Sequence, residues 1–109
     1  MENTIIELTI EEFAEEVEML RLEKGVTFLK IDENFNKRGN ITYIVNNLLI
    51  NIEDDVVTCD DEYHIILSNK YVLLTFLKKC LISIHKVINK GITYIELKFT
   101  DGYVKIEII

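Results

Sequence analysis

The side chains with the most chemical potential lie together at residues 59–64, where a cysteine, three acidic residues, a tyrosine and a histidine follow one another. A thiol and an imidazole form a nucleophilic pair only when they lie within hydrogen-bond reach and nearby donors stabilise an oxyanion. Adjacent strands could bring Cys59 close to His64, but no motif around them predicts such donors. The pattern therefore favours a solvated acidic turn, continuous with the acidic residues 53–55, over a catalytic centre.

This acidic run also lacks the composition of a metal site. A calcium loop needs a central glycine and a terminal glutamate, and a structural zinc site needs more ligands than one cysteine and one histidine supply. The other histidine, His85, is expected on the surface of a strand or half-buried in it. The sequence contains no glycine-rich phosphate loop, CxxC pair or nucleophile elbow. We therefore expect a non-enzymatic protein with no metal and no cofactor.

Two tyrosines are interleaved with the lysines of the C-terminal half, a pattern that can bind single-stranded nucleic acid. Residues 63–109 contain no arginine, however, and the acidic N-terminal half would repel phosphate. Direct nucleic-acid binding is therefore disfavoured. The residues concerned are Lys78, Lys79, Lys86, Lys90, Lys98, Lys105, Tyr94 and Tyr103.

The strongest local signal predicts a helix at residues 10–24. Thr9 and Glu12 have the spacing of a capping box, in which each side chain bonds the backbone amide of the other residue. Gly25 is placed to end the helix, because glycine adopts the left-handed conformation easily. Five apolar residues between them recur at helical spacing and should face the core: Ile10, Phe13, Ala14, Val17 and Leu20.

The opposite side of this helix is the candidate binding site. At 100° per residue, Met19 and Leu22 fall away from the apolar stripe and among acidic side chains. An apolar anchor with a charged rim is typical of protein-binding patches, because the anchor supplies desolvation energy and the rim supplies orientation. The alternative is that the last turn twists and Leu22 joins the core. The predicted partner-binding residues are Glu11, Glu12, Glu15, Glu16, Met19, Leu22 and Glu23.

The other apolar segments predict an α+β fold with a mainly antiparallel sheet. Strands are expected at residues 4–8, 26–32, 56–59 and 63–67. Residues 41–52 fit a helical stripe as well as strands, and we interpret them as strands broken at residues 46–47. A second helix is expected at residues 69–81, capped by Ser68 or Asn69, because these apolar residues repeat at i, i+3, i+4, i+7 and i+8: Leu73, Phe76, Leu77, Cys80 and Leu81.

Residues 82–109 predict a C-terminal β-meander. The last hairpin, with Asp101 and Gly102 as its loop, directs one apolar row of each strand to the same face. That loop would place Lys98 opposite Lys105 and Glu96 opposite Glu107, with charges of opposite sign on the diagonals. If residues 103–109 form a sheet edge, they can pair with a second copy of the chain.

Composition sets the overall class. The chain has 109 residues, which is one domain's worth, and 49% apolar against 28% charged residues supports a packed core. No apolar run approaches the roughly 18 residues that span a membrane, and the first residues do not resemble a signal peptide. We therefore expect a single cytoplasmic domain, residues 1–109, with no membrane association and with both cysteines as free thiols.

Charge patterning leads to the functional hypothesis. Residues 1–62 carry 16 acidic and 5 basic residues, whereas residues 63–109 carry 3 acidic and 7 basic residues. Such asymmetry can steer association with a charged partner. The leading hypothesis is a small acidic interaction module that inhibits a basic, nucleic-acid-processing protein stoichiometrically. Immunity proteins and phage anti-defence proteins share this broad profile. The alternative is a structural or accessory homo-oligomer, for example a homodimer paired through the C-terminal edge strand.

Overall fold

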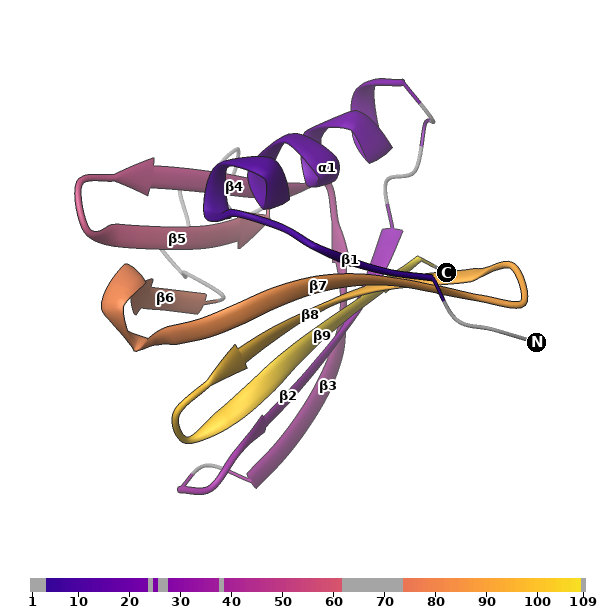
Figure 1. Ribbon diagram of the computed structural model, residues 1–109. Coiled ribbons are helices and arrows are strands. Elements are labelled where there is room, and N and C mark those ends of the chain that lie inside the picture. Colours follow the sequence, from indigo (N-terminus) through magenta and orange to yellow (C-terminus); the bar gives the residue numbers. More distant parts are fainter. Residues whose placement is uncertain (1–3, 24, 26–27, 38, 62–73, 109) are drawn as a thin grey trace.

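A computed structural model describes residues 4–23, 25, 28–37, 39–61 and 74–108 (Figure 1). Its described part contains one α-helix, α1 (Ile10–Leu22), and a short 3₁₀ turn, η1 (Lys78–Cys80). The strands are β1 (Thr4–Glu7), β2 (Phe28–Phe35), β3 (Gly39–Asn46), β4 (Leu48–Glu53), β5 (Val56–Asp61), β6 (Leu74–Leu77), β7 (Leu81–Asn89), β8 (Ile92–Phe99) and β9 (Gly102–Ile108). The α+β class and the mainly antiparallel sheet are thereby confirmed.

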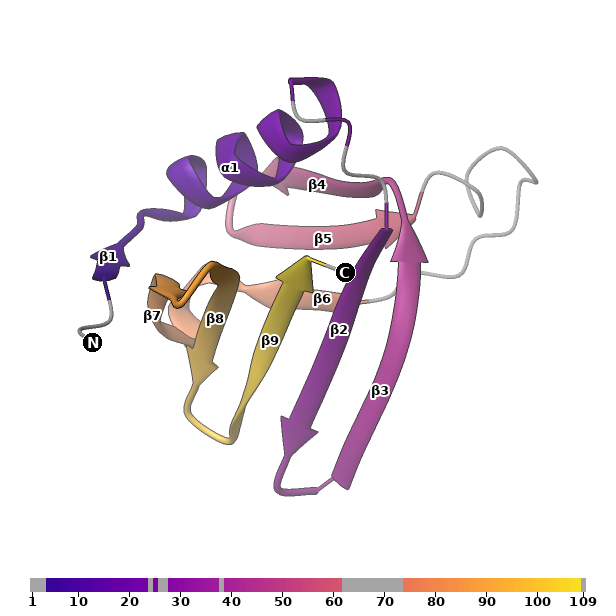
Figure 2. The same cartoon turned by 90° about the vertical axis from the view of Figure 1, so that its right-hand side faces the viewer.

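The strands form two antiparallel sheets. The larger has the order β1-β7-β8-β9-β2-β3, and the smaller has the order β4-β5-β6. The chain passes from one sheet to the other at Asn47, whose positive φ of 56° turns it sharply between β3 and β4. This confirms that residues 41–52 are strands with a break at residues 46–47. Figure 2 shows the small sheet and α1 covering the same side of the large sheet.

The helix α1 begins as the sequence predicts. The Thr9 N–H donates to Glu12 Oε1 at 2.9 Å, and the Glu12 N–H donates to Thr9 Oγ1 at 3.1 Å. Two backbone donors at the helix start are thus satisfied, which stabilises the helix by about 1 kcal/mol. The helix ends at Leu22, two residues before the expected end, and Gly25 adopts the predicted left-handed conformation.

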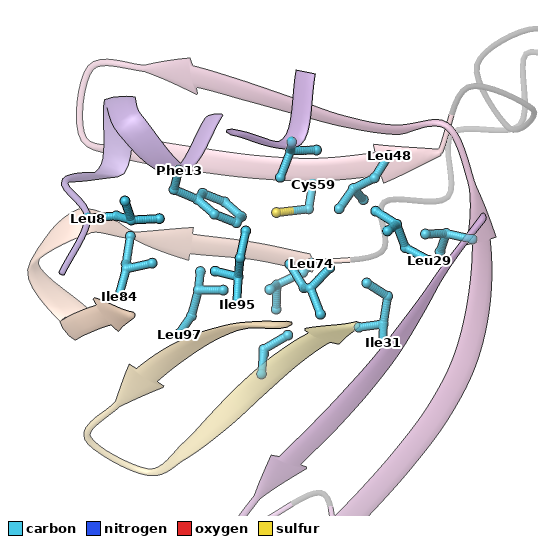
Figure 3. Close-up of a cluster of buried hydrophobic side chains, with 14 of the residues drawn as sticks. Leu8, Phe13, Leu29, Ile31, Leu48, Cys59, Leu74, Ile84, Ile95 and Leu97 are labelled. Atoms are coloured by element: carbon cyan, nitrogen blue, oxygen red, sulfur yellow. The ribbon is translucent and has the colours of Figure 1, made fainter. Parts of the chain in front are cut away.

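The core lies between the inner face of the large sheet, α1 and the small sheet (Figure 3). Phe13 and Val17 of α1 are buried against this layer, as are Leu97 of β8 and Leu48 of β4. Each fully buried apolar side chain of this size contributes roughly 1.5–3 kcal/mol. Because the buried side chains of α1 face the core, the opposite side of the helix faces solvent.

The predicted second helix at residues 69–81 is wrong. Residues 74–77 form β6, residues 78–80 form η1, and β7 begins at Leu81, while residues 69–73 lie outside the described residues. The short apolar stretch fits the period of a strand as well as that of a helix. Its pairing with β5, in which Leu74 lies opposite Cys59, favours the strand. The Phe76 ring then lies 4.9 Å from the Phe99 ring, centroid to centroid. The strand predicted at residues 63–67 also lies outside the described residues.

The last hairpin has the predicted inner face but a different register. Phe99 lies opposite Gly102, so the turn consists of residues 100–101 rather than Asp101 and Gly102. Glu96 is consequently opposite Lys105, and the like-charge pairs expected from the sequence are wrong. The shift places opposite charges directly across the strands, which is the more stable arrangement.

The C-terminal strand is not an edge. β9 pairs with β8 on one side and with β2 on the other, so the predicted homo-oligomer cannot form through residues 103–109. Local sequence patterns could not specify this, because β2 and β9 are distant along the chain. Within the described part, β1 and β3 are the two edges of the large sheet.

Candidate protein-binding surface

The outward side of α1 carries two exposed apolar residues among carboxylates. Met19 is 43% exposed and Leu22 is 63% exposed, so the alternative in which Leu22 joins the core is wrong. We call the set of exposed residues on this side the acidic helix surface. It consists of Glu11, Glu12, Glu15, Met19, Leu22 and Glu23.

The carboxylates of the acidic helix surface differ in how far they are already engaged. Glu12 accepts the capping hydrogen bond, and Glu11 lies 3.8 Å from the Lys78 ammonium, a loose and largely exposed pair. Glu15 makes no hydrogen bond or ion pair within the described part of the chain. Glu15 can therefore pair with an incoming cation without losing an existing contact.

Glu16 lies apart from the other predicted site residues. The Lys86 ammonium of β7 donates to Glu16 Oε2 at 2.9 Å, and both side chains are partly buried. Glu16 is adjacent to the buried arc of the helix, so its carboxylate turns toward the sheet instead of solvent. Its contact with Lys86 fixes α1 on β7 and removes this charge from the outward rim.

Glu18 is an exposed acid that the sequence argument omitted. It lies on the β4 side of the helix, where it lines a shallow cavity of about 160 Å³ with Ala14 and Leu49. Glu16 and Glu18 each lie about 100° from Val17, on opposite sides, so helix geometry alone could not separate the exposed Glu18 from the half-buried Glu16. Glu18 extends the negative charge of α1 toward the small sheet.

The reactive run at residues 59–64 does not form one site in the described structure. Glu53 ends β4, and Asp54 and Asp55 form the exposed turn to β5, whereas Cys59 is buried in the core. Burial, followed by the negative charges of Glu33 and Asp60, raises the pKa of the Cys59 thiol to about 12. The thiol is therefore protonated at neutral pH and is a poor nucleophile. Residues 62–64, including His64, lie outside the described residues.

Glu33 is a buried carboxylate that the sequence argument also missed. It points from β2 toward the core and accepts a hydrogen bond from the Tyr43 hydroxyl of β3. The alternation Leu29, Ile31, Glu33, Phe35 could have revealed it, because residues at i and i+2 share a face. A buried carboxylate needs such a donor, so this contact is structural in character.

Among the residues that the structure describes, no three histidine, cysteine, aspartate or glutamate side chains are grouped to hold a metal ion. His85 is half-buried, as expected, and lies in register between Glu7 and Glu96. Within the same described residues, no helix is long and apolar enough to cross a bilayer.

The outer face of the large sheet, opposite the core, alternates positive and negative charge. Lys105 lies between Glu96 and Asp32, and its ammonium is 4.4 Å from the centroid of the Tyr94 ring. Lys30 lies opposite Glu107. Both of these lysines have carboxylates as neighbours, which repel phosphate. This face is therefore poorly suited to bind a nucleic-acid backbone.

No protein-family model matches this chain, and comparisons with curated proteins and with solved structures give no match either.

Proposed function

We propose that this protein binds a basic protein through the acidic helix surface. The observation that carries the proposal is the exposure of Met19 and Leu22 among the carboxylates of α1. Burial of a fully exposed side chain of this size contributes roughly 1.5–3 kcal/mol, and the part still to be gained on binding follows from the exposed fractions of 43% for Met19 and 63% for Leu22. The surrounding carboxylates select a cationic partner and orient it.

Glu15 is the central rim residue in this proposal. Its carboxylate is exposed and unengaged within the described residues, whereas Glu12 serves the helix cap and Glu16 serves the helix-sheet contact. A net charge of −7 adds long-range attraction toward a basic surface, which raises the association rate more than the affinity.

The most concrete form of the proposal is a stoichiometric, non-enzymatic inhibitor of a nucleic-acid-processing protein in the cytoplasm. Such a protein needs a basic surface to bind phosphate. The acidic helix surface competes for that surface with negative charge and adds apolar contacts that phosphate does not make. Inhibition by occupancy requires no catalytic group in the inhibitor, in keeping with a Cys59 thiol that stays protonated at neutral pH.

The proposal is tested by capture from a lysate of the native host with three baits. One is the natural chain, one carries Glu15→Lys, and one carries Asp101→Lys as the matched control. The control changes the net charge equally, but its residue lies in the exposed β8–β9 turn, distant from α1 (Figure 1). We expect the natural chain and the control to retain the same basic protein and Glu15→Lys to retain less.

Titration of the captured partner then tests inhibition. The partner's activity on nucleic acid should fall linearly with added protein and stop at one equivalent, because each inhibitor occupies one site. Equal capture by all three baits would contradict the binding site, and undiminished partner activity would contradict inhibition.

A further inference from the structure

Among the strands that the structure describes, β3 is an edge strand of the large sheet. It pairs with β2 along its entire length, from Asn46 opposite Phe28 to Gly39 opposite Phe35. Within the described part of the chain no strand pairs with its other side, and Figure 2 shows it as the outermost strand. Backbone groups on that side are therefore placed to bond another strand.

The two edges of the large sheet differ in protection. β1 has only four residues and ends in Glu7, and both shortness and charge discourage edge pairing. β3 has eight residues without a charge or a proline. Its side chains include the exposed Ile41 on the core-side face and Ile44 on the outer face, the latter 62% exposed. β3 is consequently the edge suited to accept a further strand.

We propose that β3 pairs with β3 of a second copy of this chain, antiparallel about a two-fold axis perpendicular to the sheet. The two large sheets then form one continuous sheet. Because a residue and its symmetry mate lie on the same face in this arrangement, the two Ile44 side chains come within diagonal reach when the pairing is centred near Tyr43. Two exposed apolar side chains are thereby shielded together.

Charge favours a second copy over a foreign charged strand. Among the described strands only β3 and the four-residue β6 lack charged residues. Two copies of β3 therefore meet without like-charge repulsion along the strand, although each chain has a net charge of −7. A basic or acidic partner strand would find no counter-charge on β3 itself.

The symmetry also limits the assembly to two chains. Pairing of β3 with β3 uses the same edge on both copies, which is an isologous contact and leaves no further β3 edge open. Pairing of β3 with β1 of another copy would instead be heterologous and could continue indefinitely. The acidic helix surface belongs to α1 and takes no part in the β3 contact, so this inference does not depend on the proposed function.

Sedimentation velocity from about 1 µM to about 200 µM tests the proposal, a range that covers the affinity expected for a small interface. We expect a monomer that becomes a dimer and nothing larger. Ile44→Lys should raise the dimer dissociation constant by about tenfold or more, because it places like charges near the axis. Ile5→Lys is the matched control, since Ile5 is 61% exposed on the other edge, and it should dimerise like the natural chain.

Circular dichroism establishes that both variants fold, and hydrogen exchange gives a second measurement. The β3 amides should exchange more slowly at dimeric than at monomeric concentrations in the natural chain, and equally at both in Ile44→Lys. A monomer over the whole range, assembly beyond the dimer, or dissociation by Ile5→Lys and not by Ile44→Lys would overturn the proposal. Glu15→Lys should leave dimerisation unchanged, which separates this test from that of the proposed function.

Discussion

At the scale of residues, burial separates the two cysteines. Cys59 lies in the core with its thiol pKa raised to about 12, whereas Cys80 is exposed in η1. In the native protein at pH 8, a thiol reagent should therefore modify Cys80 alone, as measured by intact mass. Cys80→Ser should remain unlabelled until denaturant is added. Labelling of native Cys80→Ser at the rate of the unfolded chain would contradict the buried position of Cys59.

The raised pKa of Cys59 also predicts a pH dependence. The folded state holds the thiol proton to about pH 12, whereas the unfolded state releases it near the ordinary value of 9.0. The contribution to stability is thus fully present below pH 9 and declines as the pH rises above it, by at most about 1.4 kcal/mol per unit. Denaturant unfolding measures this dependence. Between pH 9 and 11, the free energy of unfolding should decline less steeply for Cys59→Ala than for the natural chain. Parallel curves for both proteins would refute this assignment.

Removal of the Tyr43 hydroxyl should destabilise the fold. Tyr43→Phe leaves the buried Glu33 carboxylate without this donor, at a cost of about 1–3 kcal/mol in the free energy of unfolding. Tyr103→Phe is the control, because among the described residues its hydroxyl accepts a single long bond, 3.3 Å from Asn34 Nδ2, at an exposed site. Urea unfolding measures both variants. Equal stability of Tyr43→Phe and the natural chain would show that Glu33 does not need this donor.

Residue-level prediction from the sequence succeeded where one local rule decides the outcome. The exposure of Met19 and Leu22 follows from helix geometry alone. The strand at Cys59 was predicted but its burial was not, because its acidic neighbours suggested a solvated turn, although Val57 and Cys59 belong to the inward-facing row of β5. The burial of Glu33 does not follow from its residue type, because a charged side chain is normally exposed, although its position places it in the apolar row of β2.

At the scale of elements, locally encoded features were predictable and long-range pairing was not. The capping box specified the start of α1, because its two hydrogen bonds join residues only three positions apart. The predicted second helix failed because pairing with β5 determines the conformation of residues 74–77. The interior position of β9 depends on β2, about 70 residues away along the chain.

The junction of β2, β8 and β9 should be sensitive to any side chain at Gly102. An added Cβ would lie 2.0 Å from the Asn34 carbonyl oxygen and 2.8 Å from Phe35 Cα, so the backbone would have to move. Gly102→Ala should lower the free energy of unfolding by about 3 kcal/mol or more. Gly91→Ala meets no atom within 4 Å and should cost only about 1–2 kcal/mol, from its positive φ. Thermal and urea unfolding measure both variants. Equal losses of unfolding free energy for Gly102→Ala and Gly91→Ala would contradict the close approach of Gly102 to β2.

At the scale of the whole molecule, the charge asymmetry of the sequence does not become two oppositely charged halves. The N-terminal β1 pairs with β7, and β2 pairs with β9, so acidic and basic segments interleave in the large sheet. Exposed negative charge is concentrated instead on the outward side of α1, where the ion pair described is the loose contact of Glu11 with Lys78. The binding proposal therefore depends on one helix surface and not on the net charge of a half-molecule.

The most direct test of this account measures association and dissociation rates of the captured partner for Glu15→Lys, Met19→Ala and Asp101→Lys. We predict that Glu15→Lys slows association several-fold and makes it less sensitive to salt, because a rim charge steers encounter. Met19→Ala should mainly accelerate dissociation, by about tenfold, because the anchor is lost. Asp101→Lys should match the natural chain in dissociation and nearly match it in association. Unchanged rates for both Glu15→Lys and Met19→Ala, with the fold preserved, would contradict the acidic helix surface as the binding site.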